Sequence, residues 1–574
     1  MVEVVRMSAE VFRWTGGPGS GKTYQLLQDV RQEVEDGRTL DDLCLMSFSR
    51  AQATDLAARL HGAVFQDADM KTITDRTSTI DAGALRAVRE AGIIEFSRDS
   101  IIQTGAKESP LYREFMEAHG IPYQPNVQLI DDTDPVARAN LPPGNQIIEI
   151  NAYLRSTMQP PSAWQEAAMA LGLHQFNGRV WGIADILPAW QEFKALKGVF
   201  EHTDYVQLAL DERVEPRGPV LFVDEYQDVS PLQAALIREW INQSERVYVA
   251  GDPDQAIYGF RGCSPDLFLS LDAKDRGAAT GQRPVSHRCP EQVMAEAERL
   301  LGHAANVSPA PRPGRYIRAN YSRNVDGLAA LIEDAIRAYP GNGARVFVLS
   351  RFRQHVTKIA KHLAAVGIPS TGIRQTTGGP WGPVRIGRYK ATLERKTVNV
   401  WSLVCAVRRV MTGVYTDRIP FEEAEAFVMA TVPADRREHA LTDLKAKVRQ
   451  GTAIRIGDLV MLLNTSRDRI FDALNLRPAI IEQIKACLSR ERRSGTVINP
   501  QMVRVDTIHA SKGLEAPAVF LHTGYLGGLL DSLTDPARLA EERRIFFVGA
   551  TRASRALICF DYLTPVWPLF GRAV

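Results

Sequence analysis

The feature that most constrains this sequence is the segment GGPGSGKT at residues 16–23. It follows a short apolar, β-prone run, VFRWT, and precedes TYQLLQDVRQEVE, whose apolar spacing is helical. The pattern GxxxxGK followed by Ser or Thr, between a strand and a helix, is typical of a phosphate-binding loop. Glycines let backbone N–H groups surround phosphate oxygens at the positive end of a helix. The sequence therefore predicts an α/β domain that binds a nucleotide.

The loop also predicts roles for single residues. Lys22 should reach the β and γ phosphates of ATP, and Thr23 should ligate Mg²⁺. The residues expected to line the phosphates are Gly16, Gly17, Pro18, Gly19, Ser20, Gly21, Lys22 and Thr23.

Two acidic residues follow a second apolar run, PVLFV, as Asp224 and Glu225. Ligands of parallel α/β sheets bind outside the carboxyl ends of the strands, so these carboxylates should project beside the phosphate-binding loop. Asp224 is then expected to hold Mg²⁺, and Glu225 to orient and deprotonate the attacking water.

Alternation of apolar strands and helices recurs along the chain. The segments RVYVAGDPDQ, ARVFVLSRF, MVRVDTIHASKGLEAPAVFLHT and RRIFFVGATRASRALICF repeat it, which indicates parallel sheets covered on both faces and a second α/β core. A chain of 574 residues should divide into several units at roughly 100 to 200 residues each. Two stretches without this alternation are interpreted as mostly helical insertions. The expected domains are 1–90 with 188–278, 91–187, 279–368 with 501–574, and 369–500.

Composition excludes some classes of protein. No run approaches the ~18 apolar residues that cross a bilayer, and MVEVVRMSAEVFRW lacks the features of a secretory signal. A cytoplasmic protein without a membrane partner is expected. The six cysteines form no CxxC pair, which argues against zinc, iron–sulfur or disulfide frameworks. The net charge is only +2, so nucleic-acid binding would depend on local basic and aromatic patches.

Several motifs carry a family resemblance. The strings DEYQD at 224–228 and GDPDQAIYGFRG at 251–262 closely resemble motifs II and III of the UvrD/Rep/PcrA helicases. The series continues in order with SHR at 286–288, TIHASKGLE at 507–515, and the segment 541–553 that runs from EERR to TRA. The resemblance covers nearly the whole chain. It implies two RecA-like P-loop NTPase motor domains that hydrolyse ATP between them.

The resemblance assigns further residues of the ATP site. Gln255 matches the glutamine that senses the γ phosphate, Glu515 the acid that contacts the ribose, and Arg288 and Arg552 the γ-phosphate arginines. Guanidinium groups suit this role because they do not titrate and bind phosphate oxygens in pairs. By sequence both arginines fall in the second motor domain, so closure of the cleft over ATP would complete the site.

The same resemblance predicts the DNA track. A motor that ignores sequence should grip the backbone and stack on bases, since every base offers a π face. The positions that match the family's single-strand contacts are Phe48, Tyr258, Phe260, Arg261 and His509. The resemblance implies that the substrates are single-stranded DNA and its junctions with duplex DNA. It also implies that the protein moves along the strand from 3′ to 5′.

Some positions depart from the family pattern. Residues 1–15 contain no glutamine to read the adenine edge, and Tyr24 and His287 replace the arginine and tyrosine that flank adenine in relatives. We expect Tyr24 and His287 to enclose the adenine instead. The segment 369–500 lacks a clear duplex-contacting sequence.

These departures keep other functions open. One alternative is a single-strand-dependent translocase that displaces proteins or serves a nuclease partner, with little unwinding. A second is a nucleotide-gated DNA-binding scaffold without hydrolysis, against which the intact catalytic residues argue. RNA as the track stays open because stacking does not discriminate against a 2′-OH.

Overall fold

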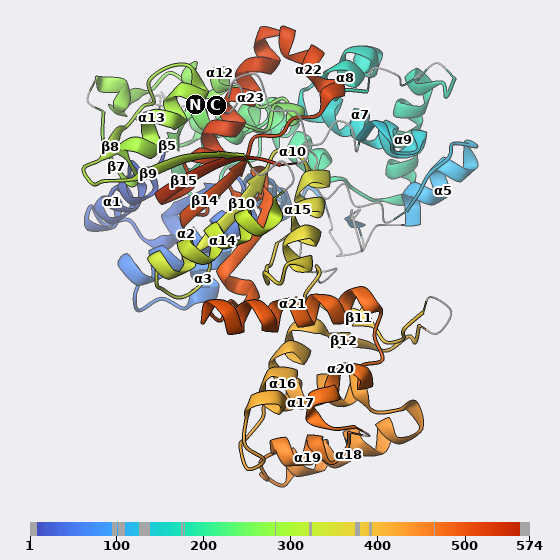
Figure 1. Ribbon diagram of the computed structural model, residues 1–574. Coiled ribbons are helices and arrows are strands. Elements are labelled where there is room, and N and C mark those ends of the chain that lie inside the picture. The colour runs from blue at the N-terminus through green and yellow to red at the C-terminus, as the bar shows by residue number, and fades with distance from the viewer. Residues whose placement is uncertain are drawn as a thin grey trace, which may run out of the picture. The chain divides into compact units, whose positions relative to one another are not determined.

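The computed structural model divides into two compact units, each with its own parallel sheet (Figure 1). The first unit contains residues 1–314 and 531–551, and the second contains residues 315–530 and 552–574. The structure describes residues 9–94, 100–101, 110–125, 138–173, 176, 178, 180–281, 283–320, 324–372, 379–389, 393–463 and 465–562. None of the helices in these ranges is long and apolar enough to span a membrane.

The first unit is built on a six-stranded parallel sheet in the order β3-β2-β4-β5-β1-β6. The strands are β1 (Glu10–Thr15), β2 (Leu43–Ser47), β3 (Thr77–Thr79), β4 (Val220–Val223), β5 (Arg246–Gly251) and β6 (Lys274–Gly277). Every residue of β2 and β4 is buried, as expected for strands covered on both faces. The predicted first α/β core is confirmed.

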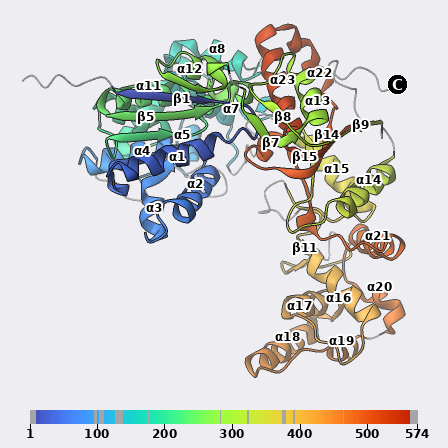
Figure 2. The same ribbon diagram turned by 90° about the vertical axis from the view of Figure 1, so that its left-hand side faces the viewer.

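Helices cover both faces of this sheet. Successive residues of β4 point to opposite faces: Phe222 joins the apolar cluster under α1 and α2, whereas Val223 joins the cluster under α4, α10 and α11. Figure 2 shows α1 and α2 on one side of the sheet and α11 on the other. The bounds are α1 (Lys22–Glu35), α2 (Arg50–Ala63), α3 (Met70–Arg76), α4 (Ile80–Glu90), α10 (His202–Asp211), α11 (Pro231–Gln243) and α12 (Pro265–Leu269).

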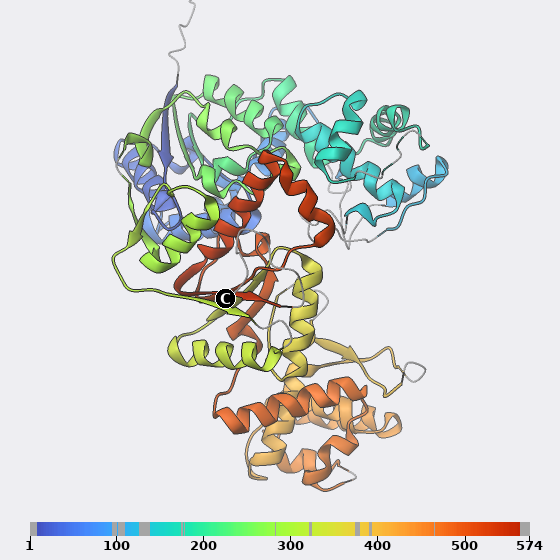
Figure 3. The same ribbon diagram turned by 45° about the horizontal axis from the view of Figure 1, so that its top comes forward.

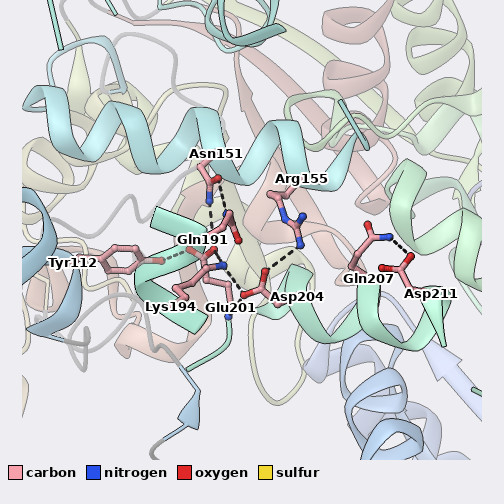
Figure 4. A network of polar contacts seen from close by, with 9 residues as sticks. All are labelled: Tyr112, Asn151, Arg155, Gln191, Lys194, Glu201, Asp204, Gln207 and Asp211. Atoms are coloured by element: carbon pink, nitrogen blue, oxygen red, sulfur yellow. Dashed lines mark hydrogen bonds and ion pairs between the residues drawn. The ribbon is translucent and has the colours of Figure 1, made fainter. Parts of the chain in front are cut away.

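The described part of the predicted insertion 91–187 is helical. It forms α5 (Pro110–Ala118), α7 (Pro143–Ser156), α8 (Trp164–Ala170) and the start of α9 (Ile183–Lys197). These helices share their own apolar cluster, which includes Phe115, Ile150 and Trp190. A buried polar network joins α5, α7 and α9 to α10 (Figure 4). Because α10 also packs on the sheet, this network ties the insertion to the first α/β core.

Two segments that we expected in the second motor domain group with the first sheet. They are residues 279–314, with β7 (Val285–Pro290), α13 (Glu291–Leu301) and β8 (Ser308–Ala310), and residues 531–551, with α23 (Pro536–Ala550). The physical reason is local packing: α13 lies on α23, and the β7–β8 segment packs on the phosphate-binding loop. The domain limits given above stay a prediction.

The second unit contains a five-stranded parallel sheet in the order β13-β10-β14-β15-β9. Its strands are β9 (Arg315–Asn320), β10 (Val346–Ser350), β13 (Val503–Thr507), β14 (Ala516–His522) and β15 (Ala553–Asp561). Helices α14 (Val325–Ala338) and α15 (Arg353–Ala365) pack on it. The predicted second α/β core is confirmed.

Within the second unit, residues 379–494 include a helical bundle, which Figure 3 shows as yellow to orange ribbons. The bundle has an apolar core of its own. Its main elements are a hairpin of β11 (Pro383–Arg385) and β12 (Thr397–Asn399), with α16 (Val400–Thr412), α17 (Phe421–Thr431), α18 (Ala434–Arg449), α19 (Ile456–Val460), α20 (Ile470–Ala473) and α21 (Pro478–Ser494). Arg490 of α21 anchors this bundle to the sheet domain: its guanidinium binds Glu333, Asp326 and the Val366 carbonyl.

Candidate active site and nucleic-acid interface

The phosphate-binding loop connects β1 to α1 as the sequence predicts. Gly21 precedes α1 with φ 83°, a left-handed conformation that favours glycine. Lys22 begins the helix, and its Nζ donates to the carbonyls of Gly16 at 2.7 Å and Gly17 at 3.3 Å. Backbone carbonyls of the loop itself therefore hold the Lys22 ammonium group close to the loop.

A second segment packs directly on this loop. Ser286 Oγ donates to the Pro18 carbonyl at 2.8 Å, and the His287 N–H donates to the Gly19 carbonyl at 2.8 Å. A β-carbon added to Gly19, which has φ 70°, would lie 2.7 Å from Arg288 Cβ, so only glycine allows this approach. Arg288 thus lies beside the phosphate-binding loop, within the first compact unit rather than the second.

Two side chains with oxygen atoms that could ligate a metal ion, Thr23 at the start of α1 and Asp224 after β4, contact each other. Thr23 Oγ1 donates to Asp224 Oδ2 at 2.8 Å, and the Glu225 N–H donates to Asp224 Oδ1 at 2.9 Å. Burial, followed by the neighbouring Glu225 carboxylate, raises the pKa of Asp224 to about 6. A hydroxyl and a carboxylate are ligands that suit a hard divalent cation such as Mg²⁺, and such a cation would favour the ionised carboxylate.

Glu225 has an unusual backbone. Its φ is 58°, a left-handed conformation that costs a residue other than glycine on the order of 1 to 3 kcal/mol and that clusters at functional sites. The Gln227 side-chain amide donates to the Glu225 carboxylate, and its carbonyl oxygen accepts from the Asp252 N–H at 3.0 Å. Gln227 therefore joins the acid at the end of β4 to the loop that follows β5.

That loop positions Gln255. Its Nε2 donates to Asp252 Oδ2 at 2.5 Å, and the side chain is buried. The preceding residue, Asp254, accepts a hydrogen bond from Asn306 Nδ2 at 3.3 Å. The Asn306 carbonyl in turn accepts one from the Gly17 N–H at 2.9 Å. Hydrogen bonds thus connect the phosphate-binding loop, Asn306 and the Gln255 loop.

Four of the predicted DNA contacts come together in the first unit. The rings of Phe48 and Tyr258 lie 4.7 Å apart, and those of Tyr258 and Phe260 lie 5.9 Å apart. The Arg261 guanidinium lies 5.7 to 6.0 Å from all three ring centroids. Phe48 comes from the end of β2 and the others from one loop, so only the fold brings them together.

Residues 3–275 match the family model of the UvrD/REP helicase N-terminal domain, and residues 409–562 match that of the UvrD-like helicase C-terminal domain. The chain belongs to the UvrD/Rep helicase family. Its two α/β cores are consistent with the two RecA-like motor domains of UvrD-like helicases.

Curated relatives of the UvrD/Rep family cover this chain in part. The ATP-dependent DNA helicase UvrD2 of Mycobacterium tuberculosis is 26% identical over 365 residues, which is 60% of this chain and 47% of that protein. The ATP-dependent DNA helicase PcrA of Bacillus subtilis is 23% identical over 418 residues, 61% of this chain and 56% of that protein. DNA helicase II of Salmonella typhimurium is 22% identical over 411 residues, which is 59% of this chain and 55% of that protein. The chain spans about half the length of the curated relatives it matches.

Three other residues expected in a UvrD/Rep-type site lie in the second unit. Glu515 and Arg552 directly precede the paired strands β14 and β15, and the Ala516 N–H donates to the Arg552 carbonyl at 3.0 Å. Arg552 is 1% exposed, Glu515 is exposed, and His509 is buried. Within this unit, the fold therefore places Glu515 and Arg552 next to each other.

The residues expected to enclose adenine, Tyr24 and His287, both lie in the first unit and are exposed, Tyr24 to 58%. The sandwich of adenine between them stays a prediction.

Sequence reasoning assigned no role to several residues that organise the site. Gln227 and Glu541 stand within the UvrD/Rep-like strings DEYQD and EERR, so the motifs contained a signal for them. Asn306 belongs to no motif, and it contacts Gly17 although almost three hundred residues separate the two in the chain. No sequence pattern could have indicated it.

We expect Asp254 to make stability depend on pH. Burial and the Asp252 carboxylate raise its pKa to about 7, against the lowering effects of His303 and Arg544. The folded state then holds a proton that the unfolded state has released, so this contribution to stability falls as pH rises from about 4 to about 7. Between these pH values, the free energy of unfolding of the wild type should fall by on the order of 1 kcal/mol or more relative to that of Asp254→Asn. Urea unfolding of both proteins at several pH values measures this, and parallel pH profiles would contradict it.

Proposed function

We propose that this chain is an ATP-dependent translocase on single-stranded DNA that couples ATP hydrolysis, with Mg²⁺, to duplex unwinding. The observation that carries the proposal is the loop of residues 252–262. One end holds Gln255 in hydrogen bonds that extend to the phosphate-binding loop and to Glu225, and the other holds the aromatic–arginine cluster. A single short loop thus joins a phosphate site to a surface suited to stacked bases.

At the phosphate site, each residue has a chemical task that its position supports. Lys22 would bind the β and γ phosphates, and Thr23 and Asp224 would hold Mg²⁺. When bound, that ion neutralises charge on the phosphate oxygens. Glu225 would orient the attacking water and accept its proton, while Gln227 holds the Glu225 carboxylate in place.

The remaining catalytic assignments follow from the family. Gln255, Arg288 and Arg552 would contact the γ phosphate, and Glu515 would contact the ribose. Guanidinium groups at that phosphate stabilise the charge that develops during transfer. Arg288 belongs to the first compact unit and Arg552 to the second.

On the DNA side, Phe48, Tyr258 and Phe260 would stack on bases, with Arg261 against the backbone and His509 as a further contact. Single-stranded DNA and its junctions with duplex DNA are the proposed substrates, and 3′ to 5′ is the proposed direction. The cytoplasmic location expected from the sequence stays a prediction.

A second candidate function is a translocase that displaces proteins or serves a nuclease partner, with little unwinding of its own. The segment 369–500, which departs from the family's duplex-contacting sequence, favours it.

Steady-state ATP hydrolysis with and without single-stranded DNA, at two salt concentrations, tests the proposal. We expect strong stimulation by DNA that weakens with salt, because backbone contacts release counterions. Hydrolysis that ignores DNA would overturn the proposal. Strand displacement with 3′ and 5′ overhangs then separates the two candidate functions and determines the direction.

Replacing Tyr258 with Ala should weaken binding of single-stranded DNA by about 5- to 150-fold, the size of one lost base stack of ~1 to 3 kcal/mol. Tyr258→Phe keeps the ring against Phe48 and should bind nearly as well as the wild type. Fluorescence anisotropy with labelled oligothymidylate measures both. Equal affinity of Tyr258→Ala and the wild type would show that the ring serves only packing.

A further inference from the structure

Helix α23 contacts the Gln255 loop at two points. Glu541 Oε1 accepts a hydrogen bond from the Gly259 N–H at 3.0 Å, and Arg544 Nε donates to the Ala256 carbonyl at 2.9 Å. Both bonds are made to the loop's backbone. They therefore fix the path of the loop between Gln255 and Phe260 without using the aromatic side chains.

The contact at Gly259 requires a residue without a side chain. A β-carbon at this position would lie 2.4 Å from Glu541 Oε1 and 2.8 Å from Glu541 Cδ, well inside van der Waals contact. Glycine thus lets the carboxylate approach the loop backbone, and any larger residue would push Glu541 away.

Arg544 is a largely buried cation that interacts with nearby carboxylates. Burial lowers its pKa, while the carboxylates of Glu541 and Asp254 favour its charged form. Charge-assisted hydrogen bonds of this kind are stronger than neutral ones, so the two contacts resist displacement of the loop relative to the helix.

The helix continues beyond the loop in both directions. Near its start, Arg538 donates to the Ala170 carbonyl at the end of α8 in the helical insertion, at 3.1 Å. Near its end, the Thr551 carbonyl accepts from Cys289 Sγ at 3.4 Å, and Arg552 follows directly in the chain. A movement at either end of α23 would therefore be transmitted to the loop by a rigid element.

We propose that Glu541 and Arg544 are positioning residues that hold the backbone of the Gln255 loop on α23 and so couple DNA binding to ATP hydrolysis. This inference rests on the proposed function. In it, stacked bases displace the loop, and α23 transmits that displacement toward Arg552. Neither residue is among those proposed to contact nucleotide or DNA.

The test is the ratio of ATP hydrolysis at saturating single-stranded DNA to hydrolysis without DNA. Glu541→Ala should lower this ratio about tenfold, the size expected for one lost charge-assisted hydrogen bond. The KM for ATP without DNA should stay unchanged. Glu541→Gln keeps an oxygen acceptor for the Gly259 N–H and should retain most of the ratio. Gly259→Ala should reproduce the loss from the opposite side of the contact.

A matched control lies two residues from Glu541 on the same helix. Arg543 donates to the Leu300 carbonyl rather than to the loop, so Arg543→Ala should keep the wild-type ratio. A ratio that is unchanged in Glu541→Ala and Gly259→Ala, with the wild type stimulated by DNA, would overturn this inference alone. An equal loss in Arg543→Ala would likewise overturn it, because the effect would then be general to the helix. A wild type that DNA does not stimulate would overturn the proposed function together with it.

Discussion

Glu225→Gln is expected to lower DNA-stimulated ATP hydrolysis by about 10²- to 10⁴-fold, the range that a positioned general base contributes. The carboxylate follows β4 and is held by the Gln227 amide on a left-handed backbone. An amide of the same shape can still accept that hydrogen bond, so the geometry survives while the capacity to take a proton is lost. Steady-state turnover at saturating ATP measures the effect.

Nucleotide binding separates this chemical effect from damage to the fold. Lys22 and the glycines of the loop remain, so Glu225→Gln should bind a fluorescent ATP analogue with near wild-type affinity. The matched control is Glu245→Gln, an exposed glutamate of the same unit that pairs only with Arg38 among the ion pairs of the described residues. Its turnover should equal that of the wild type. Hydrolysis that survives in Glu225→Gln would assign the general base elsewhere.

The second large effect is on stability. Lys194→Ala should lower the free energy of unfolding by about 3 to 5 kcal/mol, the typical cost of removing one partner from a buried ion pair. The Lys194 side chain is 3% exposed, and its Nζ lies 2.6 Å from Glu201 Oε2 and 2.5 Å from Asp204 Oδ2. Figure 4 shows the ammonium between these two carboxylates. Without it, two acids that are largely buried face each other.

The surrounding bonds explain why the structure cannot easily relax. Glu201 also accepts from the Tyr112 hydroxyl at 2.8 Å, and Asp204 accepts from Arg155 at 3.1 Å and caps α10 through the Glu201 N–H. These partners hold the carboxylates in place between the helical insertion and the helix that packs on the first sheet. The same substitution therefore weakens the attachment of the insertion.

A neighbouring lysine on the same helix provides the control. Lys197 pairs with Glu114, but both side chains are about half exposed, so Lys197→Ala should cost only about 0 to 1 kcal/mol. Urea unfolding followed by circular dichroism measures both variants against the wild type. Equal destabilisation by the two substitutions would mean that the Lys194 network contributes little beyond an exposed ion pair.

Local sequence was sufficient for several parts of this protein. The phosphate-binding loop, the apolar strands β2 and β4, and the acids that end β4 each depend on a few adjacent residues. Strand, loop and helix preferences are short-range, and the carboxyl ends of parallel strands necessarily meet at one edge of a sheet. The prediction that Thr23 and Asp224 lie at the same edge of the sheet followed from these two facts.

Other features were decided only by the tertiary structure. The contact of the Arg288 segment with the phosphate-binding loop is made through Ser286 and His287, which are far from that loop in the sequence. Similarly, the approach of Glu541 to Gly259 and the bridge from Asn306 to Gly17 join residues far apart in the chain. Such contacts depend on how helices and loops pack at close range, where a single β-carbon decides the fit, and a pattern within a short window contains no information about it.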